Sequence, residues 1–303
     1  MMDVSVVVPA YDQAALLGHA LRALLDQTLA PDRYEVVVVD DGSTDDTTRV
    51  VEALAPRIRL LRFPANRGRS AARNAGIRAA RADLIVFVDS DVLVRPDFLD
   101  QHRRTHAGHG REVLSRGPVV TVPSVDAAGA RVPRFAASPA YLDTANAGVA
   151  RAALERAGMF DEGFPGYGWE DFELGIRLKR AGVRRVFCPQ AVAFHVQPPT
   201  QWADVGSLAR KEDARARSAA YFYRKVPTLE TRLLIQLTPV HRLVYWLLSC
   251  GGWLDSTRAA ALAGRLKRRG WSSLAFAVLR SGLNQHYLRT LRRELMHHAP
   301  AAA

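Results

Sequence analysis

The chain has 303 residues, of which 48% are hydrophobic and 24% are charged, as in an ordinary folded protein. Its two cysteines, Cys188 and Cys250, have neither the spacing of a metal site nor that of a disulfide framework, which favours a reducing compartment. No uncharged apolar run reaches about 18 residues and no signal-peptide pattern opens the sequence, so we expect neither a transmembrane helix nor a secretory leader.

The N-terminal part alternates between apolar runs and amphipathic patterns. Apolar runs predict strands at residues 4–8, 34–39 and 58–63, and apolar residues at helical spacing predict helices at 13–27, 47–54 and 70–80. A further buried strand begins at Leu84 and ends at two carboxylates, Asp89 and Asp91. This alternation is typical of an α/β protein with a mostly parallel sheet flanked by helices.

The pattern changes after Asp91. The sequence predicts a helix from Arg95, a strand at 113–122, a Pro- and Ala-rich loop or hairpin at 123–140, a short helix ending near Gly158 and an aromatic loop at 163–169. A helix at 170–181 follows, which Gly182 closes, and then come extended segments at 183–187 and 191–196.

The composition shifts again near residue 200, where we place a domain boundary. Basic helices are expected at 202–224, 259–269 and 274–295, and an apolar stretch at 231–250 is interrupted by Pro239, His241 and Arg242. The expected organisation is therefore an α/β domain at 1–200, with halves 1–95 and 96–200, and a basic helical extension at 201–303.

The net charge of +12 is concentrated in that extension. Residues 201–303 hold 17 Lys+Arg and 6 Asp+Glu, a net of +11, whereas residues 1–200 hold 25 and 24, a net of +1. Such asymmetry suggests an anionic partner such as a membrane, a nucleic acid or an acidic polymer. A basic surface that serves only solubility is the open alternative.

Polar clusters follow the strands of the N-terminal part. In an open α/β sheet, ligands bind outside the carboxyl ends of the strands, so these clusters face one crevice. Strand alternation places Asp89 and Asp91 on the same side, where a divalent cation would relieve their repulsion. Helix capping is the simpler alternative for such acids. The clusters are 9–11 (PAY), 40–41 (DD), 66–74 (NRGRSAARN) and 89–91 (DSD).

With these motifs in this order, the chain resembles family 2 glycosyltransferases with the GT-A fold. The matching segments are 6–11 (VVVPAY), 39–43 (VDDGS), 66–68 with 72–74, and the DXD motif at 89–91. The segment 166–174 (GYGWEDFEL) resembles the WED segment of galactosyl- and N-acetylgalactosaminyltransferase domains. The resemblance covers about residues 3–200.

The resemblance implies a donor site in the first half and an acceptor site in the second. Asp41 would contact the nucleotide base with support from Asp40, and Asp91 and His195 would bind Mn²⁺ or Mg²⁺, with Asp89 on the metal or the ribose. Imidazole among carboxylates favours Mn²⁺. The donor-binding residues that it implies are Pro9, Tyr11, Asp40, Asp41, Arg73, Asn74, Asp89, Asn146, Trp169 and Glu170.

Asp171 is the candidate general base, because it opens the helix that begins at Glu170 and because the resemblance places a base there. The helix dipole at that position favours an ionised carboxylate. Glu170 would point about 100° away around the helix. Tyr167 and Trp169 could stack on a sugar or pack in a core, and both readings stay open.

The implied function is a metal-dependent, inverting hexosyl transfer from a nucleotide-diphosphate sugar, UDP by default, to a hydroxyl of a glycan or lipid-linked acceptor. Polysaccharide assembly at the cell envelope is the expected setting. A transferase to polyprenyl phosphate is the first alternative, and a non-catalytic module that binds an anionic polymer is the second. The extension has no nucleic-acid motif, so nucleic acid is not the expected partner.

We expect the protein in the cytoplasm, peripherally at the inner face of the membrane through residues 201–303. An arginine at the centre of a spanning helix costs about 2.5–3.5 kcal/mol, which favours an interfacial arrangement of the apolar stretch. Packing of that stretch on protein is the alternative. The basic side chains expected to meet anionic lipid are Arg265, Lys267, Arg268, Arg269, Arg292 and Arg293.

Overall fold

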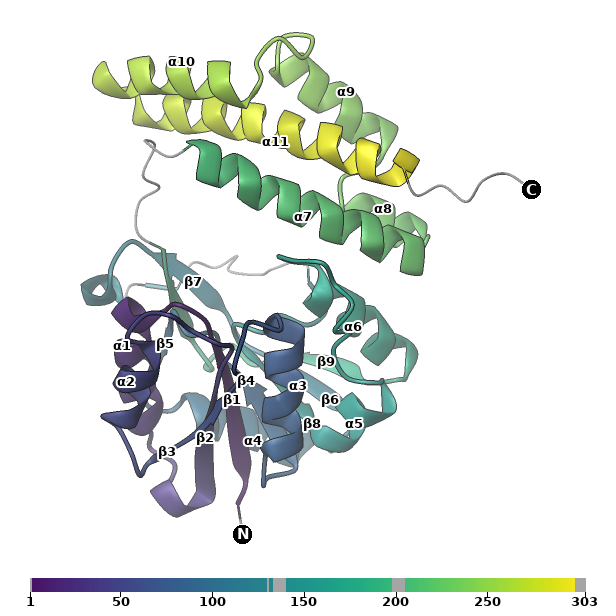
Figure 1. The fold of residues 1–303 in the computed structure, drawn as a ribbon. Helices are drawn as coiled ribbons and strands as arrows, with labels where there is room; N and C mark the ends of the chain where they lie inside the picture. Colours follow the sequence, from purple (N-terminus) through teal and green to yellow (C-terminus); the bar gives the residue numbers. More distant parts are fainter. Residues whose placement is uncertain (1, 130, 133–139, 198–204, 298–303) are drawn as a thin grey trace. The chain divides into compact units, whose positions relative to one another are not determined.

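A computed structural model describes residues 2–129, 131–132, 140–197 and 205–297 (Figure 1). The chain forms two compact units. Unit 1 comprises Met1–Glu162 and Glu170–Pro199, and unit 2 comprises Gly163–Trp169 and Thr200–Ala303. The expected boundary at 200/201 lies outside the described residues, and the aromatic loop 163–169 groups with the C-terminal helices.

Unit 1 is built on a seven-stranded sheet with the order β3-β2-β1-β4-β8-β6-β9. Every neighbouring pair is parallel except the two pairs that β8 makes, which are antiparallel. The mixed α/β class with a mostly parallel sheet is thereby confirmed. The strands are β1 (Val4–Ala10), β2 (Tyr34–Asp40), β3 (Ile58–Arg62), β4 (Leu84–Phe87), β6 (Val113–Arg116), β8 (Ala147–Ala150) and β9 (Arg184–Phe187).

Helices cover both faces of this sheet, as Figure 1 shows. Alternate residues of β1 divide between two cores: Val6 and Val8 pack with α1, α2 and α4, whereas Val7 packs with α3, α5 and α6. This division is what period-two side chains of a doubly covered strand produce. The helices are α1 (Ala14–Leu25), η1 (Pro31–Arg33), α2 (Thr47–Glu52), α3 (Arg69–Ala79), α4 (Phe98–His109), η2 (Val125–Ala127), α5 (Arg151–Arg156) and α6 (Glu170–Arg180).

The central apolar run does not continue as a strand to its carboxylates. Strand β4 ends at Phe87, and the chain turns through Asp89, whose carbonyl accepts from the Val92 amide at 3.1 Å. The expectation that the strand continues to both acids is therefore wrong, and strand alternation does not determine where their side chains point. The short strand β5 (Val92–Val94) follows immediately.

A second sheet has the order β5-β10-β7, with β10 spanning Ala193–Val196 and β7 Val119–Val122. The single strand expected at 113–122 is divided at Gly117 and Pro118, so that β6 and β7 join different sheets. Proline cannot donate to a ladder, and a Cβ on Gly117 would lie 1.9 Å from the Ala191 carbonyl oxygen. Strand β10 is antiparallel to β5, which brings His195 opposite Val92 and beside Asp91.

Unit 2 is helical, and its longest helix, α11, packs along α7, α9 and α10 (Figure 1). Small and apolar residues, among them Ala263, Ala275 and Leu279, form its core. The helices are α7 (Val205–Lys225), α8 (Leu229–Leu234), α9 (Pro239–Leu248), α10 (Ser256–Arg268) and α11 (Ser272–His297). Within the described ranges, no helix combines the length and the apolar character needed to span a bilayer.

Candidate active site

Two acids at the end of β2 shape the loops around the sheet edge. Asp40 is fully buried and accepts from the Ser43 amide at 2.9 Å and the Thr48 hydroxyl at 2.5 Å. Asp41 accepts from the amides of Arg67 and Gly68 at 2.7 and 2.9 Å. Burial raises the pKa of Asp41 despite these two hydrogen bonds. Asp40 therefore fixes the turn after β2, and Asp41 fixes the loop that leads into α3.

The end of β1 leaves an aromatic side chain beside these acids. Tyr11 is 43% exposed, which leaves a ring face open to a ligand, and Pro9 is half-buried in the preceding strand. Asp12 adopts a positive φ of 48° and accepts from the Thr44 amide at 2.8 Å, which ties the β1 loop to the β2 loop. The negative charge of Asp12 raises the pKa of Tyr11.

A buried arginine on α3 joins two acids that are distant in sequence. Arg73 is 2% exposed and donates to Asp89 Oδ1 and to Glu170 Oε1, both at 2.9 Å. Burial disfavours its charge, but the two carboxylates outweigh burial and raise the pKa of Arg73. Its ring contact with Phe160, at 5.4 Å, completes the enclosure. One oxygen of this assembly, Glu170 Oε2, is buried without a hydrogen-bond partner among the described residues.

Asp171 is the second residue of α6 and follows Glu170, which forms the ion pair with Arg73. Its Oδ1 accepts from the Phe172 amide at 2.9 Å. Burial, followed by the negative charges of Glu170 and Asp143, raises the pKa of Asp171 well above its ordinary value, while Arg73 opposes the shift. The expectation that the helix N-terminus keeps this carboxylate strongly acidic is incomplete, since desolvation and neighbouring acids act in the opposite direction. The result is a more basic carboxylate.

Asp91 and His195 form a second polar contact at the sheet edge. His195 Nε2 lies 3.1 Å from Asp91 Oδ2, and both side chains are about a quarter exposed, at 24% and 28%. Burial alone would lower the pKa of His195. The hydrogen bond and negative charge of Asp91 have a larger, opposite effect, so the pKa is raised overall. Asp89 instead reaches Arg73, so the three expected ligands divide into a pair and a single acid.

These two side chains offer one oxygen and one nitrogen to a cation, a donor set that suits Mn²⁺. Across the described ranges, however, no three His, Cys, Asp or Glu side chains are grouped closely enough to hold a metal ion. The pair Asp91 and His195 therefore fits part of a metal site, and further ligands would have to come from a bound molecule or from rearrangement of Asp89.

The side chains of two asparagines that were expected to bind the donor make hydrogen bonds within the protein. Asn74 exchanges hydrogen bonds with the backbone of Phe160, at 2.8 and 2.9 Å, and donates to Glu162 at 2.8 Å. Asn146 donates to the carbonyls of Pro118 and Ala191 at 3.0 and 2.7 Å and contacts His102 at 3.0 Å. Both amides anchor chain segments around the site.

Trp169 lies inside unit 2. Its indole nitrogen donates to the Arg215 carbonyl at 3.1 Å, and its ring stacks on Phe222 with centroids 6.3 Å apart. The residue has a positive φ of 78°, the backbone bend by which the loop 163–169 reaches the start of α6. Of the two readings of Trp169, the described contacts are those of core packing. Tyr167 is 38% exposed and has the Lys211 ammonium 4.7 Å from its ring centroid.

Sequence reasoning missed three charged residues near the site. Asp143 lies before β8, raises the pKa of Asp171 and His195, and lies 3.8 Å from Arg116. Glu162 bonds Asn74 and lies 3.6 Å from Arg67. None of the three, Arg116, Asp143 and Glu162, belongs to a recognisable motif. The one signal in the sequence was the position of Asp143 close to Asn146, a predicted donor-site residue.

Sequence comparison finds proteins that are similar to this chain. Residues 5–121 match the sequence model of the family described as glycosyl transferase family 2. Validoxylamine A glucosyltransferase of Streptomyces hygroscopicus subsp. limoneus is 33% identical over 276 residues, which cover 77% of this chain and 59% of that protein. Chondroitin synthase of Escherichia coli is 26% identical over 283 residues, covering 76% of this chain and 40% of that protein. The chain thus spans less than two thirds of the length of these relatives.

Solved structures share the fold. The mannosyltransferase PcManGT from Pyrobaculum calidifontis, in complex with GDP-Man and Mn²⁺, superposes with a TM-score of 0.59 at 24% identity, covering 97% of this chain and 86% of that chain. TarS from S. aureus superposes with a TM-score of 0.56 at 17% identity, covering 99% and 93%. Residues 5–121 thus carry the sequence pattern of glycosyl transferase family 2, and the described fold is shared with these two structures, in agreement with the expected GT-A fold.

Proposed function

We propose that the chain is an inverting glycosyltransferase that moves a sugar from a nucleotide-diphosphate donor to an acceptor hydroxyl. The observation that carries this proposal is the buried contact of Arg73 with Asp89 and Glu170, with Asp171 as the next residue. This contact fixes a DXD acid and the residue next to the expected base in one charged assembly. Preorganised charge of this kind usually contributes more to enzyme catalysis than any other single effect.

The donor nucleotide binds at the ends of β1 and β2 in this proposal. Tyr11 offers its exposed ring to the nucleotide base, Pro9 lies two residues earlier in β1, and Asp41 accepts from the nucleotide base. Asp40 holds the turn on which Asp41 stands. Asn74, Asn146 and Trp169 act indirectly, by anchoring the segments described above. The sugar lies toward Asp89 and Glu170, whose buried Oε2 is an acceptor for a sugar hydroxyl.

The nucleotide is UDP by default, with GDP and dTDP as alternatives. Among the structural neighbours, PcManGT is in complex with GDP-Man, and TarS structures are in complex with UDP and with UDP-GlcNAc. These complexes support a nucleotide-sugar donor for this chain. Which nucleotide base it prefers is to be determined by measuring the binding of different nucleotide sugars.

Asp91 and His195 would hold a divalent cation, Mn²⁺ or Mg²⁺, with Asp89 near it. The Mn²⁺ in the PcManGT complex supports the use of a divalent cation. The cation, when bound, would stabilise the negative charge of the departing nucleoside diphosphate.

Asp171 is the proposed base. The acceptor hydroxyl gives its proton to the Asp171 carboxylate while its oxygen bonds to the anomeric carbon, and the bond from that carbon to the diphosphate oxygen breaks. The configuration inverts because attack and departure occur on opposite faces. The raised pKa of Asp171 suits the role, since a general base works best with a pKa near the operating pH.

Transfer to polyprenyl phosphate is the second candidate, and the exposed apolar helix α9 favours it, since none of its ten residues is buried. A phosphate acceptor is already ionised and needs no base. Under either candidate we propose that unit 2 meets the cytoplasmic face of a membrane. The third reading, a binding module without catalysis, predicts no release of nucleoside diphosphate.

A thermal-shift panel of UDP-, GDP- and dTDP-sugars, each with and without Mn²⁺, tests the proposal. A ligand at 100 times its dissociation constant adds about 2.7 kcal/mol to the free energy of unfolding. We expect one nucleotide series to stabilise the chain and Mn²⁺ to enlarge the shift. If no nucleotide sugar changes the melting temperature in either condition, the donor site does not exist as described.

A further inference from the structure

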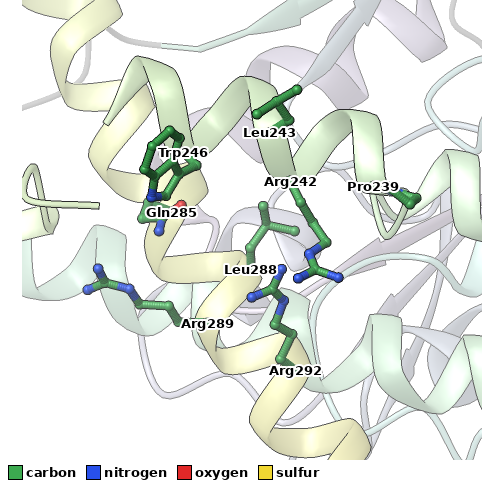
Figure 2. A pocket seen from close by; sticks show the side chains of 8 residues that line it. All are labelled: Pro239, Arg242, Leu243, Trp246, Gln285, Leu288, Arg289 and Arg292. Atoms are coloured by element: carbon green, nitrogen blue, oxygen red, sulfur yellow. The ribbon is translucent and has the colours of Figure 1, made fainter. Parts of the chain in front are cut away.

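A pocket in unit 2 carries charge that nothing in the proposed transfer reaction uses. It has a volume of about 430 Å³ and lies between α9 and α11 (Figure 2). Arg242, Arg289 and Arg292 line it, and none of its eight lining residues is acidic. Three cations without an acid among the lining residues mark a place where an anion would be stabilised.

The two arginines at the centre of the pocket lie beside each other. Figure 2 shows the guanidinium groups of Arg242, on α9, and Arg292, on α11, turned toward one another. Burial and the positive charge of Arg242 lower the pKa of Arg292, as expected for neighbouring cations. Neither arginine pairs with a carboxylate among the described residues, in contrast to Arg215, which lies 2.8 Å from Glu212. Arg289 donates to the Gly252 carbonyl at 2.7 Å and keeps further donors.

The wall beside these arginines is apolar. Leu243 and Trp246 of α9 and Leu288 of α11 line the same pocket. Leu243 and Trp246 are 58% and 51% exposed, and Leu247 on the same helix is 59% exposed. A cationic pocket that opens beside exposed leucine and tryptophan matches a molecule with an anionic head and an apolar chain, because each part finds its own surface.

We propose that this pocket binds the phosphate of an anionic membrane phospholipid, with the phosphate between Arg242 and Arg292 and the acyl chain along Leu243 and Trp246. Bidentate arginine contacts suit a phosphate group better than point-charge contacts do. The inference rests on the proposed membrane location of unit 2 and extends it, since it assigns binding to one pocket rather than to general positive charge.

The test uses the full chain and two variants of equal charge. Arg242→Gln/Arg292→Gln removes the central cations, whereas Arg210→Gln/Arg217→Gln removes two exposed cations of α7 that lie outside the pocket and are not among the side chains expected to meet lipid. Flotation is measured with vesicles of phosphatidylcholine alone and of phosphatidylcholine mixed with phosphatidic acid. Each basic residue near an anionic surface is worth about 1 kcal/mol, so we expect the pocket variant to lose about 30-fold in partitioning. The control should lose several-fold less, and an equal loss in both variants would overturn the proposal.

A soluble probe separates the pocket from the membrane. Dihexanoyl phosphatidic acid below its micelle concentration should raise the melting temperature of the wild type and of the control variant, but not that of the pocket variant. Inorganic phosphate should act at least tenfold more weakly, and Leu243→Ser should weaken the lipid but not inorganic phosphate. Equal binding of phosphate and lipid would refute the lipid assignment. If vesicles fail to bind while the soluble lipid binds only with the pocket intact, the membrane location fails and the pocket stands.

Discussion

The two units differ in whether their arginines have acidic partners. In unit 1, Arg73 is enclosed and its two terminal nitrogens each meet a carboxylate. In unit 2, Arg242 and Arg292 face one another without an acid among the residues lining their pocket. In the first arrangement both terminal nitrogens of Arg73 already have a carboxylate partner, which fixes the geometry of the three side chains. The second is the arrangement that we propose binds an anion.

The difference follows from where each arginine stands in its fold. Arg73 lies on α3, whose buried face packs on the central sheet, so its charge requires partners in order to be buried at all. Arg242 lies on α9, which has no buried residue, so water can solvate its charge. In our proposal, a buried and paired arginine positions reacting groups, whereas arginines without acidic partners bind a surface.

The largest expected effect is that of Asp171→Asn on catalysis in unit 1. The substitution removes the proposed proton acceptor and nearly preserves shape, so donor affinity should survive while transfer falls by about 10²–10⁴-fold. The wild-type rate should fall as the pH drops through the raised pKa of Asp171, because protonation removes the base. Initial rates across pH in both proteins check this. Wild-type rates in the variant would place the base elsewhere or indicate a phosphate acceptor.

Arg73→Met sharpens the comparison through stability. It leaves Glu170 buried without its cation, which should lower the free energy of unfolding by about 3–5 kcal/mol. Urea denaturation followed by circular dichroism measures this change. Arg69→Gln is the matched control, because the Arg69 side chain is 41% exposed and its Nε lies 3.7 Å from Glu170; a loss below about 1 kcal/mol is expected there. Equal losses would mean that burial of the ion pair is not what matters.

Protonation of a buried histidine should make unit 1 sensitive to acid. Burial lowers the pKa of His102 from its ordinary 6.5 to about 3, and the ring bonds Ser115 and Asn146. Between these two values the unfolded chain binds a proton that the folded chain does not, so stability falls with falling pH. His102→Gln should reduce this slope by about 1.4 kcal/mol per pH unit. The exposed His109→Gln is the control, and an unchanged slope in His102→Gln would contradict the neutral buried ring.

The smallest effect concerns the core of unit 2. Tyr287 is fully buried on α11, and its hydroxyl donates to the Ile235 carbonyl at 3.0 Å. Tyr287→Phe removes one neutral hydrogen bond and should cost about 0.5–1.5 kcal/mol. Calorimetry of the full chain measures it as a small fall in the melting temperature. A loss as large as that of Arg73→Met would break the comparison, because unit 2 would then depend on a buried polar contact as strongly as unit 1 does.

Much of unit 1 was predictable because its signals are local. The apolar runs that form β1, β2 and β4, and the turn residues after them, carry period and length information within a few residues. The contact of Arg73 with Glu170 was not predictable in this way, since it joins residues 97 positions apart in the chain. The contact of the Asp89 side chain with Arg73 on α3 was also not predictable, because it depends on β4 ending at Phe87.

Unit 2 was predictable in composition but not in detail. The concentration of positive charge and the interrupted apolar stretch were visible in the sequence, and they agree with basic helices and with an exposed α9. The pairing of Arg242 with Arg292 arises from packing of α9 on α11, which no local pattern specifies. Likewise, the grouping of Trp169 with unit 2 could not be foreseen from a motif that spans Trp169 and Glu170.

The central claim is that unit 1 is a metal-dependent transferase whose cation rests on Asp91. Release of nucleoside diphosphate from the nucleotide sugar selected by the binding panel tests it most directly. We predict release by the full chain with Mn²⁺, none in excess EDTA, and loss of the Mn²⁺-dependent rate in Asp91→Ala with the fold retained by circular dichroism. Full turnover in EDTA, or an Asp91→Ala rate equal to that of the wild type, would contradict it.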